Sequence, residues 1–347
     1  MLKKMGKNVV VIITSILLIS FAYSAYEMLI PAQKVDTNTE IAIPKGASFR
    51  QAVEILAAER LIRDKNIFLL LGRLTGADRK IRAGYYSIWP GMSPLDIFKV
   101  LRKGQIIEYE IKILEGDSLF EIADSFTKTG IISKKDFIKL SKDPDFLSSY
   151  GIESPSIEGY IFPDTYLIPK GMPAEDALGT MINRMHEKYS SEVLNSEGSD
   201  MTENEVLTLA SIIEKEAVVD SERPLISAVY HNRLRKKMPL QADPTCIYGI
   251  KSSKEPITRA DLLSNTLYNT YTIKGLPPGP IASPGVKSIQ AALHPANVPY
   301  LYFVSRDDRT HSFSTTLEEH MQAVRLYRAR KQELKESLTE RTKNGSS

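Results

Sequence analysis

Hydrophobic residues form one continuous run near the start of the chain and shorter periodic patterns after it. The run covers residues 9–26, contains no charged residue and follows three lysines. Its 18 residues are at the lower limit for a helix that crosses about 30 Å of hydrocarbon. Because the next positive charge is Lys34, the positive-inside rule places the N-terminus in the cytoplasm and the remainder outside. The pattern predicts a transmembrane anchor over residues 9–30 after a cytoplasmic tail of residues 1–8, with a cleavable signal peptide as the alternative.

Two segments beyond this run repeat the same order of turn and helix signals. Residues 43–49 align with residues 113–119, and in both a glycine stands two positions before a serine that can cap a helix. Residues 86–96 align with residues 166–176, where a short strand pattern precedes a Gly-Met turn and another helix. The repetition indicates a duplicated strand, turn and helix unit, with chance similarity as the alternative.

The duplication predicts two small α+β modules, at residues 40–105 and 108–189. Two copies favour paired compact domains over a solenoid, which needs more repeats. The second module opens with Gly-Asp-Ser-Leu-Phe-Glu-Ile-Ala at residues 116–123, a pattern that resembles the start of LysM glycan-binding repeats. Helix capping and packing alone also explain the pattern, so a purely structural module is the alternative.

A polar, serine-rich stretch at residues 190–204 predicts a connection to a further domain, at residues 200–338. Thr202 and Glu205 have the spacing of a capping box directly before an apolar run, which predicts a helix over residues 205–217. The remaining elements predicted for this domain are a helix that ends at Leu234, a loop region rich in Pro and Gly at 239–286, strands at 300–304 and 311–314, and a helix from Leu317.

Composition excludes several classes of protein. Hydrophobic residues make up 42% and charged residues 25%, values typical of a globular chain rather than a disordered or multi-span membrane protein. The net charge of +3 is explained by the N-terminal lysines, which argues against nucleic-acid binding. Cys246 is the single cysteine, so no intramolecular disulfide or cysteine metal cluster is expected. The histidines lack zinc-site spacing and no phosphate or dinucleotide loop is present, so we expect neither metal nor cofactor.

One glutamate of the predicted 205–217 helix is a candidate proton donor. The apolar residues that define its buried stripe are Val206, Leu209, Ala210, Ile213 and Ala217. At 100° per residue, Glu216 lies within about 60° of the centre of this stripe. Burial and the negative end of the helix dipole both disfavour the charged carboxylate and raise its pKa. Glu216 therefore suits general-acid cleavage of a glycosidic bond, with an ion pair to Lys215 or Arg223 as the alternative.

Six ordered motifs between residues 207 and 320 resemble the endolytic murein transglycosylases of the MltG (YceG-like) family. The matching runs lie at residues 207–216, 240–249, 268–271, 275–285, 292–295 and 300–313. The predicted anchor, the LysM-like region and residues 160–166 fit the same family. In that family the second glutamate of the Glu-Lys-Glu run is catalytic, which the resemblance places at Glu216. Ala242 and Cys246 depart from the familiar Thr and Val, but neither change removes a needed functional group.

The resemblance implies cleavage of the β-1,4 bond between N-acetylmuramic acid and N-acetylglucosamine within peptidoglycan strands. The substrate's own C6 hydroxyl attacks, so 1,6-anhydro ends form and one carboxyl can serve as acid and then base. Asp243 would either stabilise positive charge at the anomeric carbon or cap the turn before Pro244. The residues expected to bind the sugars are Gln241, Asp243, Thr245, Tyr248, Tyr268, Asn269, Thr270 and Tyr271.

The resemblance also implies a cellular setting. The fold expected is α+β, with an N-terminal transmembrane helix, LysM-like α+β modules and a C-terminal α+β catalytic domain outside the cell membrane. Peptidoglycan glycan strands are the expected partner, with peptidoglycan synthases (penicillin-binding proteins) beside them, and cleavage would end strand elongation. A membrane-anchored peptidoglycan-binding scaffold without activity is one alternative, and an ordinary hydrolase that uses water is another.

Overall fold

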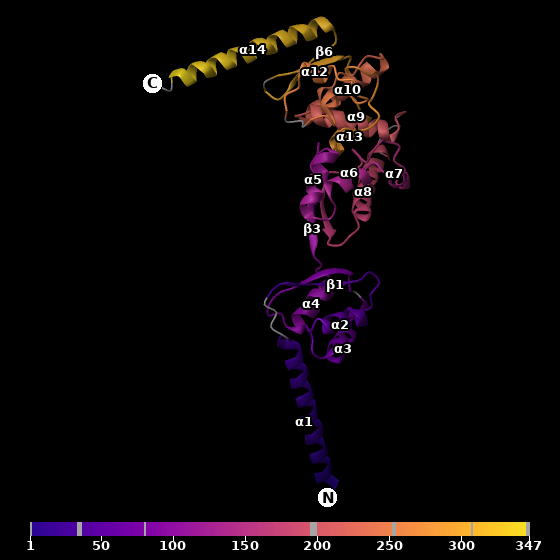
Figure 1. Cartoon of the computed structure of the whole chain (residues 1–347), viewed down its shortest axis with the longest axis vertical. Helices are drawn as coiled ribbons and strands as arrows, with labels where there is room; N and C mark the ends of the chain where they lie inside the picture. Colours follow the sequence, from indigo (N-terminus) through magenta and orange to yellow (C-terminus); the bar gives the residue numbers. More distant parts are fainter. Residues whose placement is uncertain are drawn as a thin grey trace. The chain divides into compact units, whose positions relative to one another are not determined.

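The computed structural model describes residues 2–32, 37–79, 81–194, 200–251, 255–306 and 308–344. The fold is mixed α+β and mostly helical, and its described strands form three two-stranded sheets (Figure 1). The chain divides into two compact units. Unit 1 comprises Met1–Glu110 with Leu167–Met172, and unit 2 comprises Ile111–Tyr166 with Pro173–Ser347.

Unit 1 begins with the long helix α1 (Leu2–Leu29). Within it, the 23 residues Lys7–Leu29 are long and apolar enough to cross a membrane. Most of their apolar side chains are exposed, with Leu17, Ile19 and Phe21 at 64%, 70% and 74%, whereas Met28 near the end of the helix is buried in the core of unit 1. The sequence prediction of one apolar N-terminal helix is therefore confirmed.

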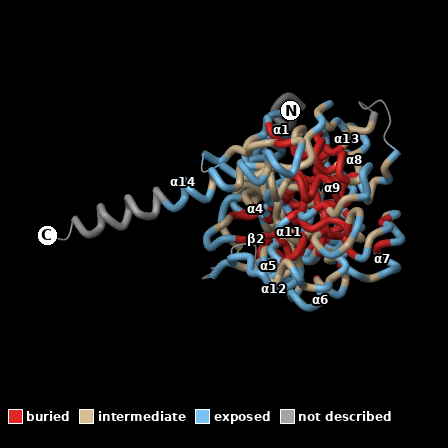
Figure 2. Tube along the Cα trace, turned by 90° about the horizontal axis from the view of Figure 1, so that it is seen from above, coloured by how far each residue is buried: buried red, intermediate tan, exposed pale blue. Residues whose placement is uncertain are grey.

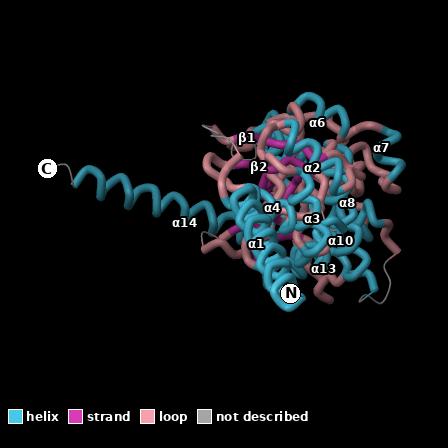
Figure 3. Tube along the Cα trace, turned by 90° about the horizontal axis from the view of Figure 1, so that it is seen from below, coloured by secondary structure: helices cyan, strands magenta, loops and turns pink. Residues whose placement is uncertain are grey.

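The rest of unit 1 is a small α+β cluster (Figure 3). Its elements are β1 (Thr39–Ile43), α2 (Phe49–Ala58), α3 (Lys65–Thr75), a 3-10 turn (Ala77–Arg79), β2 (Gly84–Ile88) and α4 (Pro94–Lys103). β1 and β2 are antiparallel, with Ile41 opposite Tyr86. The rings of Phe49, Phe68 and Phe98 contact one another in the core. Their burial accounts for the packing of the three helices against the strands.

Unit 2 opens with the same order of elements. They are β3 (Glu108–Lys112), α5 (Leu119–Thr129), α6 (Lys134–Leu140), α7 (Pro144–Ser149), β4 (Thr165–Pro169) and α8 (Ala174–Leu194). β3 pairs with β4, and the boundary between the two units passes through both strands. Ser118 occupies the N-cap of α5 and its backbone N–H donates to the Glu121 carboxylate at 2.8 Å. The predicted strands and capped helices of both repeats are thus confirmed.

The predicted connection at residues 190–204 begins too early. α8 continues to Leu194, because serine and glutamate are tolerated on an exposed helix surface and Gln290 donates a hydrogen bond to Glu192 at 2.9 Å. Residues 195–199 of the predicted connection lie outside the described residues.

The C-terminal part of unit 2 is arranged around one helix. Its elements are α9 (Glu203–Glu216), a 3-10 turn (Asp220–Glu222), α10 (Arg223–Arg235), α11 (Asp243–Ile247), α12 (Arg259–Leu262), α13 (Val286–Leu293), β5 (Tyr302–Ser305), β6 (His311–Ser314) and α14 (Leu317–Asn344). β5 and β6 are antiparallel. The short helices α11 and α12 lie in the region predicted as loop. Proline at the second position favours the start of α11, and a capping box starts α12.

The middle of helix α9 is buried on every side rather than along one stripe (Figure 2). Every residue from Val206 to Ile213 is buried, because α10, α11 and α13 pack around the helix. The predicted capping box is confirmed: Thr202 Oγ1 accepts from the Glu205 N–H at 3.3 Å and the Glu205 carboxylate accepts from the Thr202 N–H at 2.8 Å. Ala217 was expected inside the helix, but it leaves the helical conformation and is only half-buried. Glu216 is consequently the last residue of α9.

Candidate functional site

Glu216 lies at the C-terminal end of the buried helix α9. Its side chain is half-buried, and Oε1 accepts a hydrogen bond from the Tyr230 hydroxyl at 3.5 Å. Burial, followed by the negative charge of Asp243, raises the pKa of Glu216 to about 8, although hydrogen bonds from Tyr230 and the Asp243 backbone oppose the shift. The carboxyl is therefore mostly protonated at neutral pH, as the sequence argument predicted.

The nearby cations are bound to other groups. Arg223 Nη1 donates to Glu214 Oε1 at 3.1 Å, in a pair whose side chains are 8% and 6% exposed. Lys215 Nζ donates to the carbonyl of Gly116 at 3.1 Å. Within the described part of the chain, no salt bridge joins Glu216 to a cation. The ion pair with Lys215 or Arg223, the alternative from the sequence, is thus not formed.

Asp243 and Tyr271 complete a cluster around this acid. Asp243 is exposed at the first position of α11, and its Oδ1 accepts from the Tyr271 hydroxyl at 2.5 Å. Ala242 rather than Asp243 occupies the N-cap of α11, so the carboxylate is free of the capping role considered from the sequence. We call Glu216, Tyr230, Asp243 and Tyr271 the acid cluster.

Three of the predicted sugar-binding residues lie inside the protein. Thr245, Asn269 and Thr270 have no exposed surface. The hydroxyls of Thr245 and Thr270 are 2.8 Å apart, and Thr270 Oγ1 accepts from the Ala242 N–H at 2.9 Å. Asn269 donates to the carbonyl of Ser264 at 2.7 Å. These bonds tie the loop before α11 to the 269–271 segment, so the structure gives the three side chains internal partners.

Gln241 lies at the edge of the same loop and is exposed. Its backbone has φ of +50°, in the left-handed region that non-glycine residues seldom adopt. The Gln241 N–H donates to the Thr270 carbonyl at 3.1 Å, and its Oε1 accepts from Arg233 at 3.3 Å. Arg233 also donates to the Leu240 carbonyl at 2.8 Å. Buried arginine contacts therefore hold the loop that leads to Asp243.

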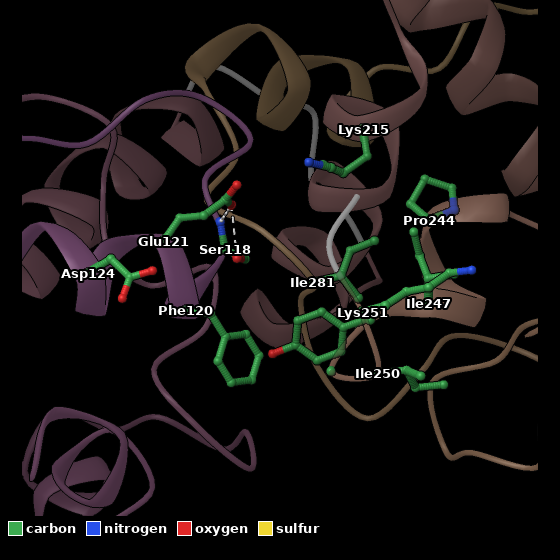
Figure 4. A pocket seen from close by; sticks show the side chains of 12 residues that line it. Ser118, Phe120, Glu121, Asp124, Lys215, Pro244, Ile247, Ile250, Lys251 and Ile281 are labelled. Atoms are coloured by element: carbon green, nitrogen blue, oxygen red, sulfur yellow. Dashed lines mark hydrogen bonds between the residues drawn. The ribbon is translucent and has the colours of Figure 1, made fainter. Parts of the chain in front are cut away.

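Two aromatic side chains, Phe120 and Tyr248, line a pocket of about 390 Å³ (Figure 4). The ring of Tyr248 is centred 4.6 Å from that of Tyr268 and 6.5 Å from that of Phe120. Phe120 comes from α5, whereas Tyr248 follows α11 directly. Two predicted residues, Tyr248 and Tyr268, are thus brought together, and Phe120 is an addition that the sequence did not single out.

Glu158 is the functional candidate that sequence reasoning missed. It is fully buried, and both of its oxygens accept from the Leu119 N–H, at 3.0 and 2.9 Å. Oε2 also accepts from the Tyr248 hydroxyl at 2.8 Å. Burial raises the pKa of Glu158 to about 7.

The sequence around Glu158 did contain a signal. The glutamate lies between the apolar residues Ile157 and Ile161, where a charged side chain has no obvious surface to occupy. Gly159 has φ of +77°, and a Cβ there would approach Pro280 to 2.3 Å, so only glycine fits. The close packing of Gly159 against Pro280 places the preceding residue, Glu158, in the interior of unit 2. Tyr230 was also missed, because its burial depends on the partners of α10.

The acid cluster has the groups needed for proton transfer. Among the residues that the structure describes, no group of three or more His, Cys, Asp or Glu side chains is placed to hold a metal ion. The acid cluster contains a mostly protonated carboxyl, an adjacent carboxylate and two phenols. Such a set can donate a proton and stabilise developing positive charge.

Comparison with known proteins places the chain in a family. The model of the YceG-like family matches residues 41–326. An endolytic murein transglycosylase of Bacillus subtilis is 34% identical over 328 residues, which cover 88% of this chain and 89% of the relative. One of Streptococcus pneumoniae is 28% identical over 83% of this chain, which spans only 59% of that longer relative.

A solved structure extends the likeness to the fold. The crystal structure of a yceG-like protein from Listeria monocytogenes aligns with a TM-score of 0.56 and 33% identity. The alignment covers 83% of this chain and 99% of the Listeria chain. With a family match over most of its length, the chain belongs to the YceG-like family.

Proposed function

We propose that this chain is an endolytic murein transglycosylase in which Glu216 acts as the single acid and base. The similarity to the Bacillus relative over nearly the whole of both chains supports the activity. One observation carries the assignment of the chemistry: Glu216 faces phenols and a carboxylate rather than a cation, and its pKa is about 8. A carboxyl with that pKa is about nine-tenths protonated at pH 7.

The reaction requires one proton donor that later accepts a proton. Glu216 donates its proton to the glycosidic oxygen as the bond between that oxygen and the anomeric carbon breaks. The C6 hydroxyl of the same muramic acid unit forms the new bond to the anomeric carbon and gives its proton to the Glu216 carboxylate. The acid is thereby restored, and the product carries a 1,6-anhydro end. Because the nucleophile is already attached, little entropy is lost in bringing it to the carbon.

Asp243 has two effects on this chemistry. Its carboxylate is exposed beside Glu216, where it raises the pKa of the acid and keeps it protonated. The same negative charge can stabilise positive charge that develops at the anomeric carbon. Asp243 is therefore an electrostatic partner rather than a second nucleophile.

The sugar-binding residues fall into two groups. We assign direct contact to Gln241, Asp243, Tyr248, Tyr268 and Tyr271, which are exposed or half-buried. Aromatic faces suit the apolar faces of sugar rings, and the polar groups suit hydroxyl and acetamido groups. Thr245, Asn269 and Thr270 support these residues from inside through the hydrogen bonds that join their loops.

The remaining parts of the chain fit work at the membrane surface. α1 is the anchor of a single-pass protein of the cell membrane with its N-terminus in the cytoplasm, as its lysines favour. Residues 40–105 and the LysM-like residues 108–189 are modules that hold the glycan strand, and residues 200–338 form the catalytic domain. Cleavage of nascent strands beside peptidoglycan synthases (penicillin-binding proteins) would end their elongation.

Replacing Glu216 by glutamine tests the acid. Glu216→Gln keeps the shape of the side chain but removes the transferable proton, so we expect the rate of anhydro-end formation to fall roughly 10²- to 10⁴-fold. Mass spectrometry of uncross-linked glycan strands after digestion measures these ends. Glu203→Gln, the same change in the first turn of α9, is the matched control and should retain activity.

Each other outcome of that digestion has a definite meaning. Anhydro ends formed at the wild-type rate by Glu216→Gln would refute the role of this residue. No cleavage by either protein would favour the non-catalytic scaffold. Reducing ends about 18 mass units heavier, one water, would show an ordinary hydrolase.

The effect of Asp243 on the acid has its own test. Removing the charge in Asp243→Asn lowers the pKa of Glu216, because the nearby anion disfavours its ionisation. Glu216 then loses its proton at lower pH, so the alkaline limb of the kcat/KM profile should move to lower pH. An alkaline limb at the wild-type position would show that Asp243 does not control the acid.

Membrane attachment can be measured by fractionation. The full chain should stay in the membrane fraction after an alkaline wash, whereas a chain without residues 1–32 should become soluble. Mass spectrometry of the mature protein separates the two interpretations of α1. A mature chain that begins near Ser24 would identify a cleaved signal peptide and contradict the anchor.

A further inference from the structure

The pocket of about 390 Å³ has walls from two separate parts of unit 2 (Figure 4). α5 contributes Phe120, and the segment from α11 onward contributes Ile247, Tyr248 and Ile250. Phe120 and Ile250 are 37% and 49% exposed, so apolar side chains face solvent here. A pocket of this volume with apolar and aromatic side chains in its lining is a common form of ligand site.

The lining of the pocket includes the chain neighbours of two residues of the acid cluster. Lys215, which lines it, directly precedes Glu216, and Pro244, which also lines it, directly follows Asp243. A polymer with its scissile bond at the acid cluster would extend past these residues. Neighbouring units of the glycan strand are therefore the occupant that the pocket favours, with the rings of Phe120 and Tyr248 against their apolar faces.

One buried carboxyl joins the two walls. Glu158 accepts from the backbone N–H of Leu119, the neighbour of Phe120, and from the hydroxyl of Tyr248 at 2.8 Å. No cation compensates it among the described residues, although burying an uncompensated carboxyl is costly. The hydrogen bonds that it accepts thus connect the start of α5 to the aromatic side chain across the pocket.

Capping of α5 explains only half of this arrangement. Leu119 is the first residue of α5, and an acceptor at a helix N-terminus satisfies a free N–H group. Capping does not require the second hydrogen bond, which Glu158 accepts from the Tyr248 hydroxyl on the other wall. Without that bond, the Tyr248 ring would lose the hydroxyl contact that fixes its orientation.

We propose that Glu158 is a positioning residue that holds Tyr248 and the start of α5 as the two walls of a saccharide-binding subsite next to the acid cluster. The identity of the sugar rests on the proposed function. Glu158 itself touches neither the reacting bond nor the proton that Glu216 transfers.

Binding can be measured without turnover in the Glu216→Gln background. Titration with uncross-linked glycan oligosaccharides should give a Kd about tenfold higher for Glu158→Gln, for Tyr248→Phe and for Phe120→Ala than for the parent. Combining Glu158→Gln with Tyr248→Phe should add little to either change, because both break the same link. In chains that retain Glu216, KM should rise while kcat stays near the wild-type value.

A matched control separates the pocket from general destabilisation. Tyr166→Phe removes a comparable buried phenol bond, from the Tyr166 hydroxyl to the Phe162 carbonyl at 2.7 Å, outside the pocket. Its Kd should equal that of the parent. If Glu158→Gln fails to fold, the Kd values of Tyr248→Phe and Phe120→Ala still show whether the pocket binds glycan.

Several results would overturn the proposal. Weaker binding by Glu158→Gln but not by Tyr248→Phe would reduce Glu158 to a helix cap. A lower kcat at unchanged KM would place Glu158 in the chemistry, and unchanged binding by all variants, or binding of a free stem peptide in place of glycan, would exclude the subsite. Glycan binding by the parent without cleavage by the wild type would instead refute the proposed function and leave the subsite intact.

Discussion

Burial of the carboxyl at the end of α9 is the constraint on which the candidate site depends. The helix is enclosed along Val206–Ile213, so its last turn brings Glu216 out of the interior with little access to water. Desolvation is the largest cause of its raised pKa, ahead of the charge of Asp243. A carboxyl on an exposed helix surface would be ionised at neutral pH and would have no proton to donate.

The arrangement of cations maintains this protonation state. Arg223 forms an ion pair with Glu214. Lys215 donates a hydrogen bond to a backbone carbonyl, and Arg233 donates to carbonyls of the loop before α11. An arginine turned toward Glu216 would favour the charged form and lower the pKa of the acid. The same contacts hold the loops around the site. One set of interactions therefore both positions these loops and keeps the cations away from Glu216.

Local signals in the sequence predicted the elements, whereas the assembly of the site required the structure. Capping at Ser118 and Thr202 and the short strand-forming runs that contain β5 and β6 depend on neighbours along the chain, so these features were predicted correctly. The links from Glu158 to Tyr248 and from Tyr230 to Glu216 span 90 and 14 residues, and no periodicity encodes such contacts. The sequence does not indicate whether a polar loop residue contacts sugar or lies in the interior. Asn269, which was expected to bind sugar, is fully buried.

The protonation state of Glu216 is the central claim, and direct titration of its carboxyl tests it. Carboxyl ¹³C NMR of glutamate-labelled full chain, with the spectrum of Glu216→Gln subtracted, isolates this one group from Glu158 and the other acids. The account predicts a midpoint near pH 8. A midpoint near the ordinary glutamate value of about 4.3 would show an ionised carboxylate at neutral pH and contradict the account.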